Sequence, residues 1–426
     1  MRILTPLLLV AGVFGLAGNA LPQEPSAAIP LGSEEYRPTP ERPFGWRGDG
    51  TGRFTGATPP TEWSATKNVR WSTVVGRSYS SPVLTDQCVL VTSEPNLLVC
   101  VNRADGVVRW KLAITPEALT DPQSRKSATD YQPPKDGSGL AAATPITDGR
   151  NIYALLANGI LCAVEMDGKT KWATGISAEP TTGYGRSASP IIATGKLIVH
   201  MSNLYAFDPA TGKQLWMNAE AKSSYGTPVA LKVGGTDLIV TPLGDVVRAD
   251  NGQSVNNGIG HTAHSSPIPC GDGVVCFGDS AVSAMRLNAA FKEDEFWSGL
   301  ITGEVFGSPL LHDNTLFITT GNGELFAFDA GTKGAQEPLI DSRALFESSG
   351  GGASPAAYAS LTLAGKFLFL NSNQGETVVL EATRPAPLVR RNTLPGGSGS
   401  SPVFSGKEMF LRDGDKLFCI RAAPGA

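Results

Sequence analysis

The apolar residues of this chain come in short runs, and the runs recur in one repeated context. A small residue, then Ser or Thr, then Pro introduces each run, and this arrangement appears eight times. The copies are Ser81-Pro82, Thr144-Pro145, Ser189-Pro190, Thr227-Pro228, Ser266-Pro267, Ser308-Pro309, Ser354-Pro355 and Ser401-Pro402. Successive prolines lie 63, 45, 38, 39, 42, 46 and 47 residues apart. A period near forty that is filled with short strands predicts a β-propeller with one blade per repeat.

The third repeat predicts how each blade is built. Strands are expected over residues 188–192, 196–201, 204–208 and 213–216, separated by turns rich in Gly, Asn and Pro. Four strands within 29 residues leave no room for a helix. The predicted fold class is therefore all-β, an eight-bladed propeller of four-stranded antiparallel blades.

The ends of the chain predict how the ring closes. The last repeat offers three strands, over residues 400–404, 408–412 and 416–421, before the chain ends. Residues 68–75 form an additional strand with no hairpin partner of their own. We expect this N-terminal strand to complete the last blade, because closure removes the open sheet edges that an incomplete ring would expose.

A motif inside the repeats extends this prediction. Residues 206–216 place an Ala, an Asp, a Gly and finally Trp216 at fixed distances, residues 100–110 repeat that spacing up to Trp110, and residues 163–172 are one residue shorter. This spacing resembles the tryptophan-docking motif of the eight-bladed quinoprotein propellers, the superfamily of the PQQ-dependent alcohol dehydrogenases. The resemblance covers residues 61–426, and residues 44–53 resemble exported bacterial proteins with PQQ-like repeats. It implies that Trp71, Trp110, Trp172 and Trp216 are structural docking residues between blades.

The N-terminus has the features of an export signal. A positively charged start precedes an apolar run over residues 7–18, and small residues at 18–20 provide a cleavage site. An uncleaved membrane anchor is the alternative. We predict a signal peptide over residues 1–20, a Pro/Gly-rich linker that buries little over 21–60, and the propeller over 61–426. The expected location is exported, either periplasmic or extracellular.

Composition narrows the partners and the thiol chemistry. Only 17% of the residues are charged and the net charge is −4, which argues against binding of nucleic acid or insertion into a membrane after signal removal. Of six cysteines, Cys88 and Cys100 flank a predicted hairpin turn, so a disulfide between them is expected. Cys270 and Cys276 are expected as free buried thiols. No Cys or His spacing predicts a metal site, and we expect a monomer.

The segments that lead into the first strands are expected to gather at one face of the propeller. The candidate ligand rim on this face comprises Arg77, Tyr79, Tyr184, Arg186, Tyr225, His261 and His264. A longer insertion over residues 115–140 is expected to cover the same face. The rim suits an envelope protein or a polar or carbohydrate-like ligand. The alternative is that these residues are solvated loop ends that only shape turns.

Catalysis finds little support in the sequence. Quinone-dependent dehydrogenases of this superfamily use an Asp base, a Ca²⁺ ion and a vicinal Cys pair, whereas this chain has no adjacent cysteines and almost no acids on its first strands. We therefore predict no catalytic residue and no cofactor, with PQQ and Ca²⁺ as the alternative. The predicted function is an exported non-catalytic binding or scaffold propeller. The alternatives are a PQQ-dependent oxidoreductase of alcohols or sugars and a cell-surface carbohydrate-binding propeller.

Overall fold

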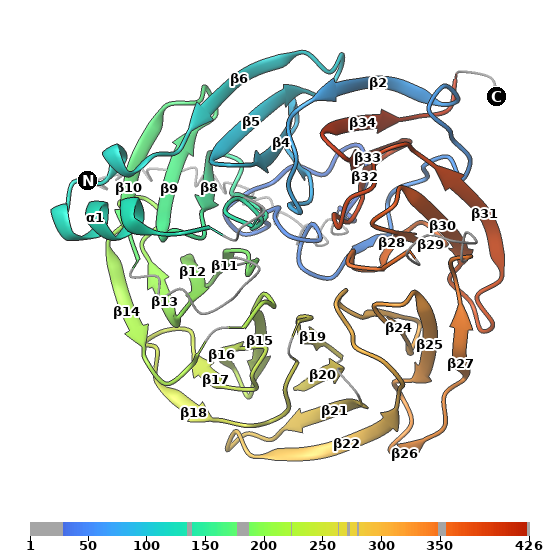
Figure 1. Ribbon diagram of the computed structural model, residues 1–426. Helices are drawn as coiled ribbons and strands as arrows, with labels where there is room; N and C mark the ends of the chain where they lie inside the picture. The colour runs from blue at the N-terminus through green and yellow to red at the C-terminus, as the bar shows by residue number, and fades with distance from the viewer. Residues whose placement is uncertain are drawn as a thin grey trace, which may run out of the picture.

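Eight β-sheets surround a central axis (Figure 1), in a computed structural model that describes most of the chain. The described residues are 29–133, 139–176, 187–222, 224–262, 264–270, 273–278, 281–347 and 355–423, without the side chains of 274–276. The prediction of an all-β, eight-bladed propeller with antiparallel blades is confirmed. Within the described residues, no helix is long and apolar enough to cross a membrane.

The first four blades are regular four-stranded sheets. Blade 1 contains β3 (Val83–Leu84), β4 (Cys88–Ser93), β5 (Leu97–Asn102) and β6 (Val108–Ala113). Blade 2 contains β7 (Ile146–Thr147), β8 (Asn151–Leu155), β9 (Ile160–Glu165) and β10 (Thr170–Gly175). Blade 3 contains β11 (Ile191–Ala193), β12 (Lys196–Met201), β13 (Asn203–Phe207) and β14 (Gln214–Asn218). Blade 4 contains β15 (Val229–Val233), β16 (Thr236–Val240), β17 (Val246–Arg248) and β18 (Ser254–Asn256).

Three of the other four blades, blades 5, 7 and 8, draw on additional segments. Blade 5 contains β19 (Ile268–Pro269), β20 (Val274–Gly278), β21 (Ala281–Leu287), β22 (Glu293–Leu300) and the parallel strand β26 (Gly334–Gln336). Blade 6 contains β23 (Leu310–His312), β24 (Thr315–Thr319), β25 (Glu324–Asp329) and β27 (Ile340–Ala344). Blade 7 contains β28 (Thr362–Ala364), β29 (Phe367–Asn371), β30 (Glu376–Glu381), β31 (Leu388–Thr393) and the parallel strand β1 (Arg53–Phe54). Blade 8 contains β32 (Val403–Ser405), β33 (Glu408–Asp413), β34 (Lys416–Ile420) and β2 (Val69–Val74).

Blade 8 confirms the predicted closure of the ring. Strand β2 pairs antiparallel with β34, so the N-terminal strand supplies the outer edge of the last blade. The buried Arg412 of β33 then crosses to blade 1, where it donates to the Thr92 carbonyl oxygen over 2.8 Å and to the Ser93 hydroxyl over 3.3 Å. Closure is therefore secured both by a sheet ladder and by side-chain hydrogen bonds.

The repeated Ser and Thr residues form a closed ring of hydrogen bonds around the axis. In each blade the backbone N–H of one buried Ser or Thr donates to the hydroxyl oxygen of its equivalent in the next blade, over 2.8–3.0 Å. The members of this hydroxyl ring are Ser81, Thr144, Ser189, Thr227, Ser266, Ser308, Ser360 and Ser401. Each bond stabilises the fold by about 1 kcal/mol net, and the eight together hold neighbouring first strands at one spacing.

One member of the ring differs from the sequence prediction. The repeat of blade 7 was expected at Ser354-Pro355, but the ring passes through Ser360, which accepts from the N–H of Ser308 and donates its own N–H to Ser401. No proline follows Ser360. The ring requires a hydroxyl group and a backbone N–H, and the Ser or Thr supplies both. The proline that follows it in the other blades is therefore not essential.

The four predicted docking tryptophans lie between neighbouring blades. Trp71, Trp110, Trp172 and Trp216 each donate the indole N–H to a turn carbonyl of the following blade, over 3.0–3.3 Å. Each indole also covers a turn glycine of that blade. These glycines have φ between +72° and +93°, and a Cβ there would lie 2.5–2.9 Å from the indole ring. The motif needs its glycine for both reasons.

The expectation of a linker over residues 21–60 is wrong for residues 29–60, which the structure describes. Phe54 is fully buried against Phe404, with ring centroids 5.3 Å apart, and Phe44 exchanges two backbone hydrogen bonds with Thr147. Arg47 is also fully buried and donates to the Leu361 carbonyl oxygen over 3.0 Å. Widely spaced apolar residues in a Pro/Gly-rich segment were enough to pack against the ends of the first strands, so this segment is part of the core.

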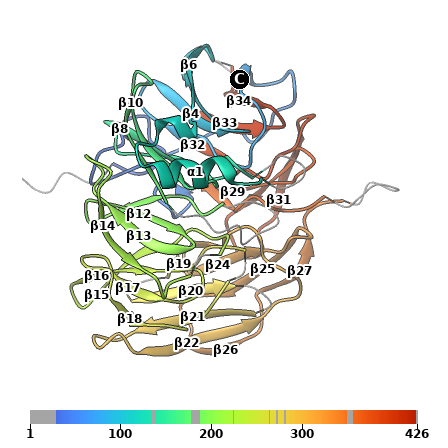
Figure 2. The same ribbon diagram turned by 60° about the vertical axis from the view of Figure 1, so that its left-hand side comes forward.

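The insertion between blades 1 and 2 contains the only helices among the described residues, η1 (Pro116–Ala118) and α1 (Pro122–Asp130). Asp121 caps α1 by accepting the N–H of Ser124 over 2.7 Å. The helix packs on β10 at the outside of blade 2 (Figure 1), and it comes to the front of the molecule in Figure 2. Beyond α1, Leu140 accepts the N–H of Ala157 from the turn between β8 and β9.

The expected disulfide is absent from the structure. Cys88 is opposite Asn102, and Cys100 is opposite Leu90, so the two cysteines are diagonal neighbours on the hairpin and both are free thiols. A hydrogen bond with Cys100 and the nearby Arg109 guanidinium lower the pKa of the Cys88 thiol. Cys270 is buried and free, and the side chain of Cys276 lies outside the described part.

Candidate functional site

An arc of aromatic side chains lies where the chain enters the first strands. Five residues occupy the same position, two residues before a member of the hydroxyl ring. They are Tyr79, Tyr225, His264, Phe306 and Tyr358, from blades 1, 4, 5, 6 and 7. Because the hydroxyl ring repeats one backbone geometry around the axis, equivalent positions present their side chains at the same level. We call these five residues the aromatic crescent.

Four members of the crescent contact one another in order. Ring centroids lie 5.3 Å apart between Tyr225 and His264, 4.9 Å between His264 and Phe306, and 5.2 Å between Phe306 and Tyr358. Gly399 occupies the equivalent position in blade 8, and a Cβ there would lie 3.1 Å from Tyr358 and 2.9 Å from Tyr79. Gly399, which has no side chain, therefore leaves room for Tyr358 on one side and Tyr79 on the other, and Tyr79 extends the crescent beyond Tyr358.

The crescent is unusually open to solvent for aromatic residues. Tyr79 is 49% exposed and Tyr358 is 44% exposed, while the other three members are partly buried. Tyrosine and histidine combine a flat apolar face with a polar atom at the ring edge. Such a surface can stack against proline, aromatic or aliphatic side chains, or against a sugar ring, and can add hydrogen bonds at its border.

The structure brings together three of the seven predicted rim residues, Tyr79, Tyr225 and His264. Arg77 and His261 are exposed in the same approach segments, beside the crescent rather than in it. Tyr184 and Arg186 lie outside the described residues.

Two members of the crescent, Phe306 and Tyr358, were not predicted as site residues from the sequence. Tyr358 was hidden because the repeat of blade 7 was aligned on Ser354 instead of Ser360. An aromatic residue two positions before Ser81, Thr227, Ser266 and Ser308 was the available signal. In blade 7 the same spacing, an aromatic residue two positions before a Ser, is found at Tyr358 and Ser360.

The half-buried Glu94 and the buried Arg412 lie beneath the rim where blades 8 and 1 meet. Burial raises the pKa of Glu94, whose carboxylate accepts the N–H groups of Gly139 and Ala141 over 2.8 and 3.1 Å. Burial lowers the pKa of Arg412 to about 9, and the charge of Glu94 opposes that shift. These groups support the rim from inside, because Glu94 anchors the end of the insertion and Arg412 joins the blades.

The described residues do not fit a quinone held by a calcium ion. The eight first strands contain no Asp or Glu, and no three His, Cys, Asp or Glu residues in the described part are grouped to hold a metal. At the ends of these strands that lie away from the rim, Phe44 pairs with Thr147 and Phe54 pairs with Ala364. A hard cation needs several oxygen ligands, which the first strands do not offer.

Fold and rim together define a propeller of the quinoprotein-like superfamily whose conspicuous surface feature is the aromatic crescent. Within that class, the chain belongs to the family described as outer membrane protein assembly factor BamB, whose match extends over residues 58–333. This family contributes no residue assignment to the crescent, which rests on the geometry above.

Individual relatives are distant. BamB of Yersinia pestis is 25% identical over 153 residues, and the matched region is 35% of this chain and 35% of that protein. The chain thus matches about a third of the length of this curated relative. The crystal structure of BamB from Moraxella catarrhalis has a TM-score of 0.57 and 12% identity, covering 84% of this chain and 98% of that one.

Enzymes with the same architecture also match. Quinohemoprotein alcohol dehydrogenase from Comamonas testosteroni has a TM-score of 0.54 at 10% identity, covering 86% of this chain and 78% of that one. A europium-containing methanol dehydrogenase has a TM-score of 0.52 at 12% identity, covering 84% and 87%. At these identities the likeness shows the fold alone.

Proposed function

We propose that this protein is an exported, non-catalytic propeller that holds an extended segment of an envelope protein on its aromatic crescent. The observation that carries the proposal is the line of ring contacts from Tyr225 to Tyr358, with Tyr79 next to it across Gly399 and the two tyrosines half-exposed at that end. Family membership supports a role in the envelope, since the family is described as an outer membrane assembly factor.

The shape of the crescent favours a chain segment as the ligand. Its aromatic rings follow one another at about 5 Å along an arc, instead of converging on a closed cavity. An extended peptide presents side chains along its length, and peptide recognition of this kind relies on aromatic anchors in a line. The low net charge of the chain leaves apolar stacking and local hydrogen bonds as the main attractions.

A photo-crosslinking experiment tests this proposal. A photoreactive amino acid at position 358 should crosslink to a protein of the envelope in cells. The matched control replaces Leu388, which is 50% exposed on the outer strand of the same blade. Crosslinking from 358 that disappears with Tyr79→Ala, and that the control position does not reproduce, supports the proposal.

The same variants separate the alternatives. Saturable binding of a neutral oligosaccharide that is lost in Tyr79→Ala/Tyr358→Ala would replace a protein segment by a carbohydrate ligand. Purified protein incubated with PQQ and Ca²⁺ is expected to retain no stoichiometric quinone and to reduce no dye with alcohols or sugars. Calcium-dependent dye reduction that is lost in His261→Ala/His264→Ala would show that the protein is an enzyme.

A further inference from the structure

A pocket rich in arginine lies on the face opposite the aromatic crescent. Strands alternate in direction, so the turns that follow first and third strands lie at the far end from the rim. Residues from such turns line the pocket together with the N-terminal segment around Glu34 and Arg37, and its volume is about 500 Å³. That volume is ordinary for a small-molecule site.

The charges of this pocket do not balance. Five arginines line it, namely Arg37, Arg70, Arg103, Arg109 and Arg421, against the three carboxylates of Glu34, Asp86 and Glu408. The pocket thus carries an excess of two positive charges. The whole chain has a net charge of −4, so this excess is a local property of the pocket.

One buried carboxylate organises three of the guanidinium groups. Glu408 has a side chain only 8% exposed, and its two oxygens accept from Arg70 over 2.6 Å, from Arg103 over 3.0 Å and from Arg421 over 3.3 Å. These arginines come from β2, from the turn after β5 and from the residue after β34. A single carboxylate fixes the positions of three cations but neutralises only one charge.

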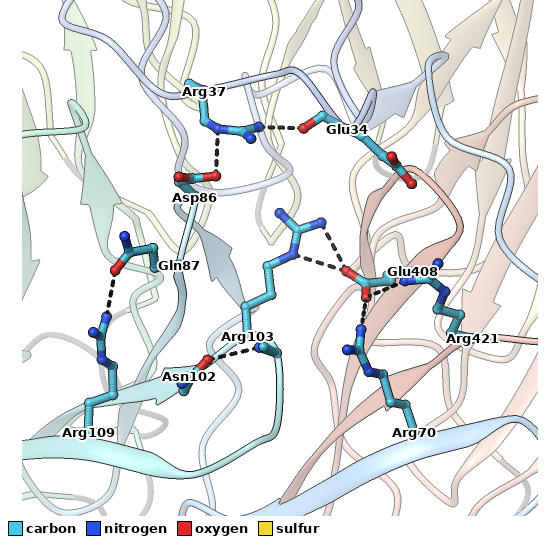
Figure 3. A pocket seen from close by; sticks show the side chains of 11 residues that line it. Glu34, Arg37, Arg70, Asp86, Gln87, Asn102, Arg103, Arg109, Glu408 and Arg421 are labelled. Atoms are coloured by element: carbon cyan, nitrogen blue, oxygen red, sulfur yellow. Dashed lines mark hydrogen bonds and ion pairs between the residues drawn. The ribbon is translucent and has the colours of Figure 1, made fainter.

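The donors that remain are directed into the pocket. Arg103 uses Nε and Nη2 for Glu408, and within the described residues its Nη1 makes no hydrogen bond. Figure 3 shows its guanidinium group at the centre of the pocket, between Arg37 and Glu408. Arg109 donates to the Gln87 side-chain oxygen over 3.2 Å and to the Cys88 sulfur over 3.1 Å, and within the described residues no carboxylate forms an ion pair with it.

We propose that this pocket binds a phosphate group with two negative charges. A phosphate monoester carries a charge of about −1.5 to −2 near neutral pH and offers three acceptor oxygens. Guanidinium groups bind such oxygens with strong, charge-assisted hydrogen bonds. The dianion matches the excess charge, and its three oxygens suit donors that approach from several directions. The source is either a soluble phosphate or the headgroup of a lipid.

Calorimetric titration with inorganic phosphate and pyrophosphate tests the site. Wild-type protein should bind one equivalent, and affinity should fall as NaCl is raised. Arg70→Gln/Arg109→Gln removes two exposed arginines, leaves the pair of Arg103 with Glu408 in place and cancels the excess charge. We expect at least about tenfold weaker binding, since a hydrogen bond to a charged group is worth that factor or more.

The matched control is Arg248→Gln/Arg384→Gln, which removes two arginines that each pair with one aspartate outside the pocket. The net charge changes equally, so the control should bind phosphate like the wild type. Equal weakening in both variants, or no saturable phosphate binding by wild type in solution or on vesicles, would overturn the proposal. Binding of a dicarboxylate without binding of phosphate would overturn it as well.

A vesicle experiment distinguishes the two sources. Phosphatidylcholine vesicles that contain phosphatidic acid are compared with pure phosphatidylcholine. Recruitment by the former that is lost in Arg70→Gln/Arg109→Gln identifies a headgroup, and phosphate binding in solution without recruitment identifies a soluble ligand. Tyr79→Ala/Tyr358→Ala should change neither result, so failure of this proposal and failure of the crescent proposal are separable.

Discussion

The interfaces between neighbouring blades, which we call seams, fall into two groups. The groups differ in how they fill the wedge between the outer strands of the two blades. At four seams, from blade 8 through blade 4, a tryptophan of the outer strand covers a glycine turn of the next blade. At the other four, between blades 4 and 8, no such tryptophan-on-glycine contact occurs among the described residues. The inner hydroxyl ring is nevertheless the same at all eight seams.

The second group uses several substitutes. Asn256 donates to the Phe291 carbonyl oxygen over 2.8 Å, and Arg343 donates to two turn carbonyls of blade 7 over 2.7 Å. Trp297 is opposite Ala284 in the docking register, yet it stacks on Phe328 and is paired with the added strand β26. Trp63 of the N-terminal segment stacks on Phe369 of blade 7.

The two groups of seams show that packing near the axis must be the same in every blade, whereas packing at the periphery can vary. Near the axis the blades are close together, so one hydrogen-bond geometry must be repeated by every blade. At the periphery the blades diverge, and the substitutes either fill the wedge, as Trp63 and Trp297 do, or satisfy a turn carbonyl, as Asn256 and Arg343 do. Loss of a filler should therefore be costly whether it is a docking tryptophan or a substitute.

Trp216→Ala and Trp63→Ala provide the sharpest test of this equivalence. Both indoles are at least nine-tenths buried, so each substitution should cost about 3–5 kcal/mol of unfolding free energy. Denaturant unfolding measures the loss, and Leu300→Ala, at a side chain that is 79% exposed, is the control. If Trp63→Ala lowers the unfolding free energy no more than the control does, the N-terminal segment does not take over the role of a docking tryptophan.

Thr227→Val tests the inner ring, which is common to both groups. The substitution keeps the shape but leaves the buried N–H of Ser189 without its acceptor, at a cost of about 1–3 kcal/mol. Thr227→Ser retains the hydroxyl and should lose much less. Equal losses in the two variants would assign the effect to the methyl group instead of the hydrogen bond.

Asn256→Ala probes a substitute that contributes mainly a hydrogen bond. We expect a loss of about 1 kcal/mol, well below that of Trp216→Ala, because Asn256 fills little of the wedge. The measurement is the same denaturant unfolding. A loss as large as that of the tryptophan would indicate that the carbonyl bond, and not the buried ring, dominates at every seam.

Glu94→Gln should have the smallest effect, and the effect should depend on pH. Because burial raises the pKa of Glu94 in the folded protein, its protonated form is favoured there. Its contribution is present below the unfolded pKa of about 4.3 and is lost as pH rises through the folded pKa. Relative to wild type, Glu94→Gln should gain stability between acidic and neutral pH. Parallel stability curves would show that burial does not control this group.

Much of the fold could be predicted from the sequence. The eight repeats, the strand that closes blade 8 and the spacing of the docking tryptophans are local patterns, and each depends on residues close together in the chain. Four of the crescent residues were also within reach, because they lie two positions before a Ser/Thr-Pro repeat, and three of these four were predicted. Trp297 was not, since a longer turn places it thirteen residues after Ala284 instead of ten.

Only the tertiary structure decided the rest, because those features join residues that are far apart in sequence. Ser360 became visible as a ring member through its bonds to Ser308 and Ser401, and Tyr358 followed from it. The packing of Phe54 depends on Phe404, and the arginine pocket needs Glu408 to gather Arg70 and Arg103 from the other end of the chain. Local periodicity determines how many blades form, whereas closure of the ring determines which distant side chains meet.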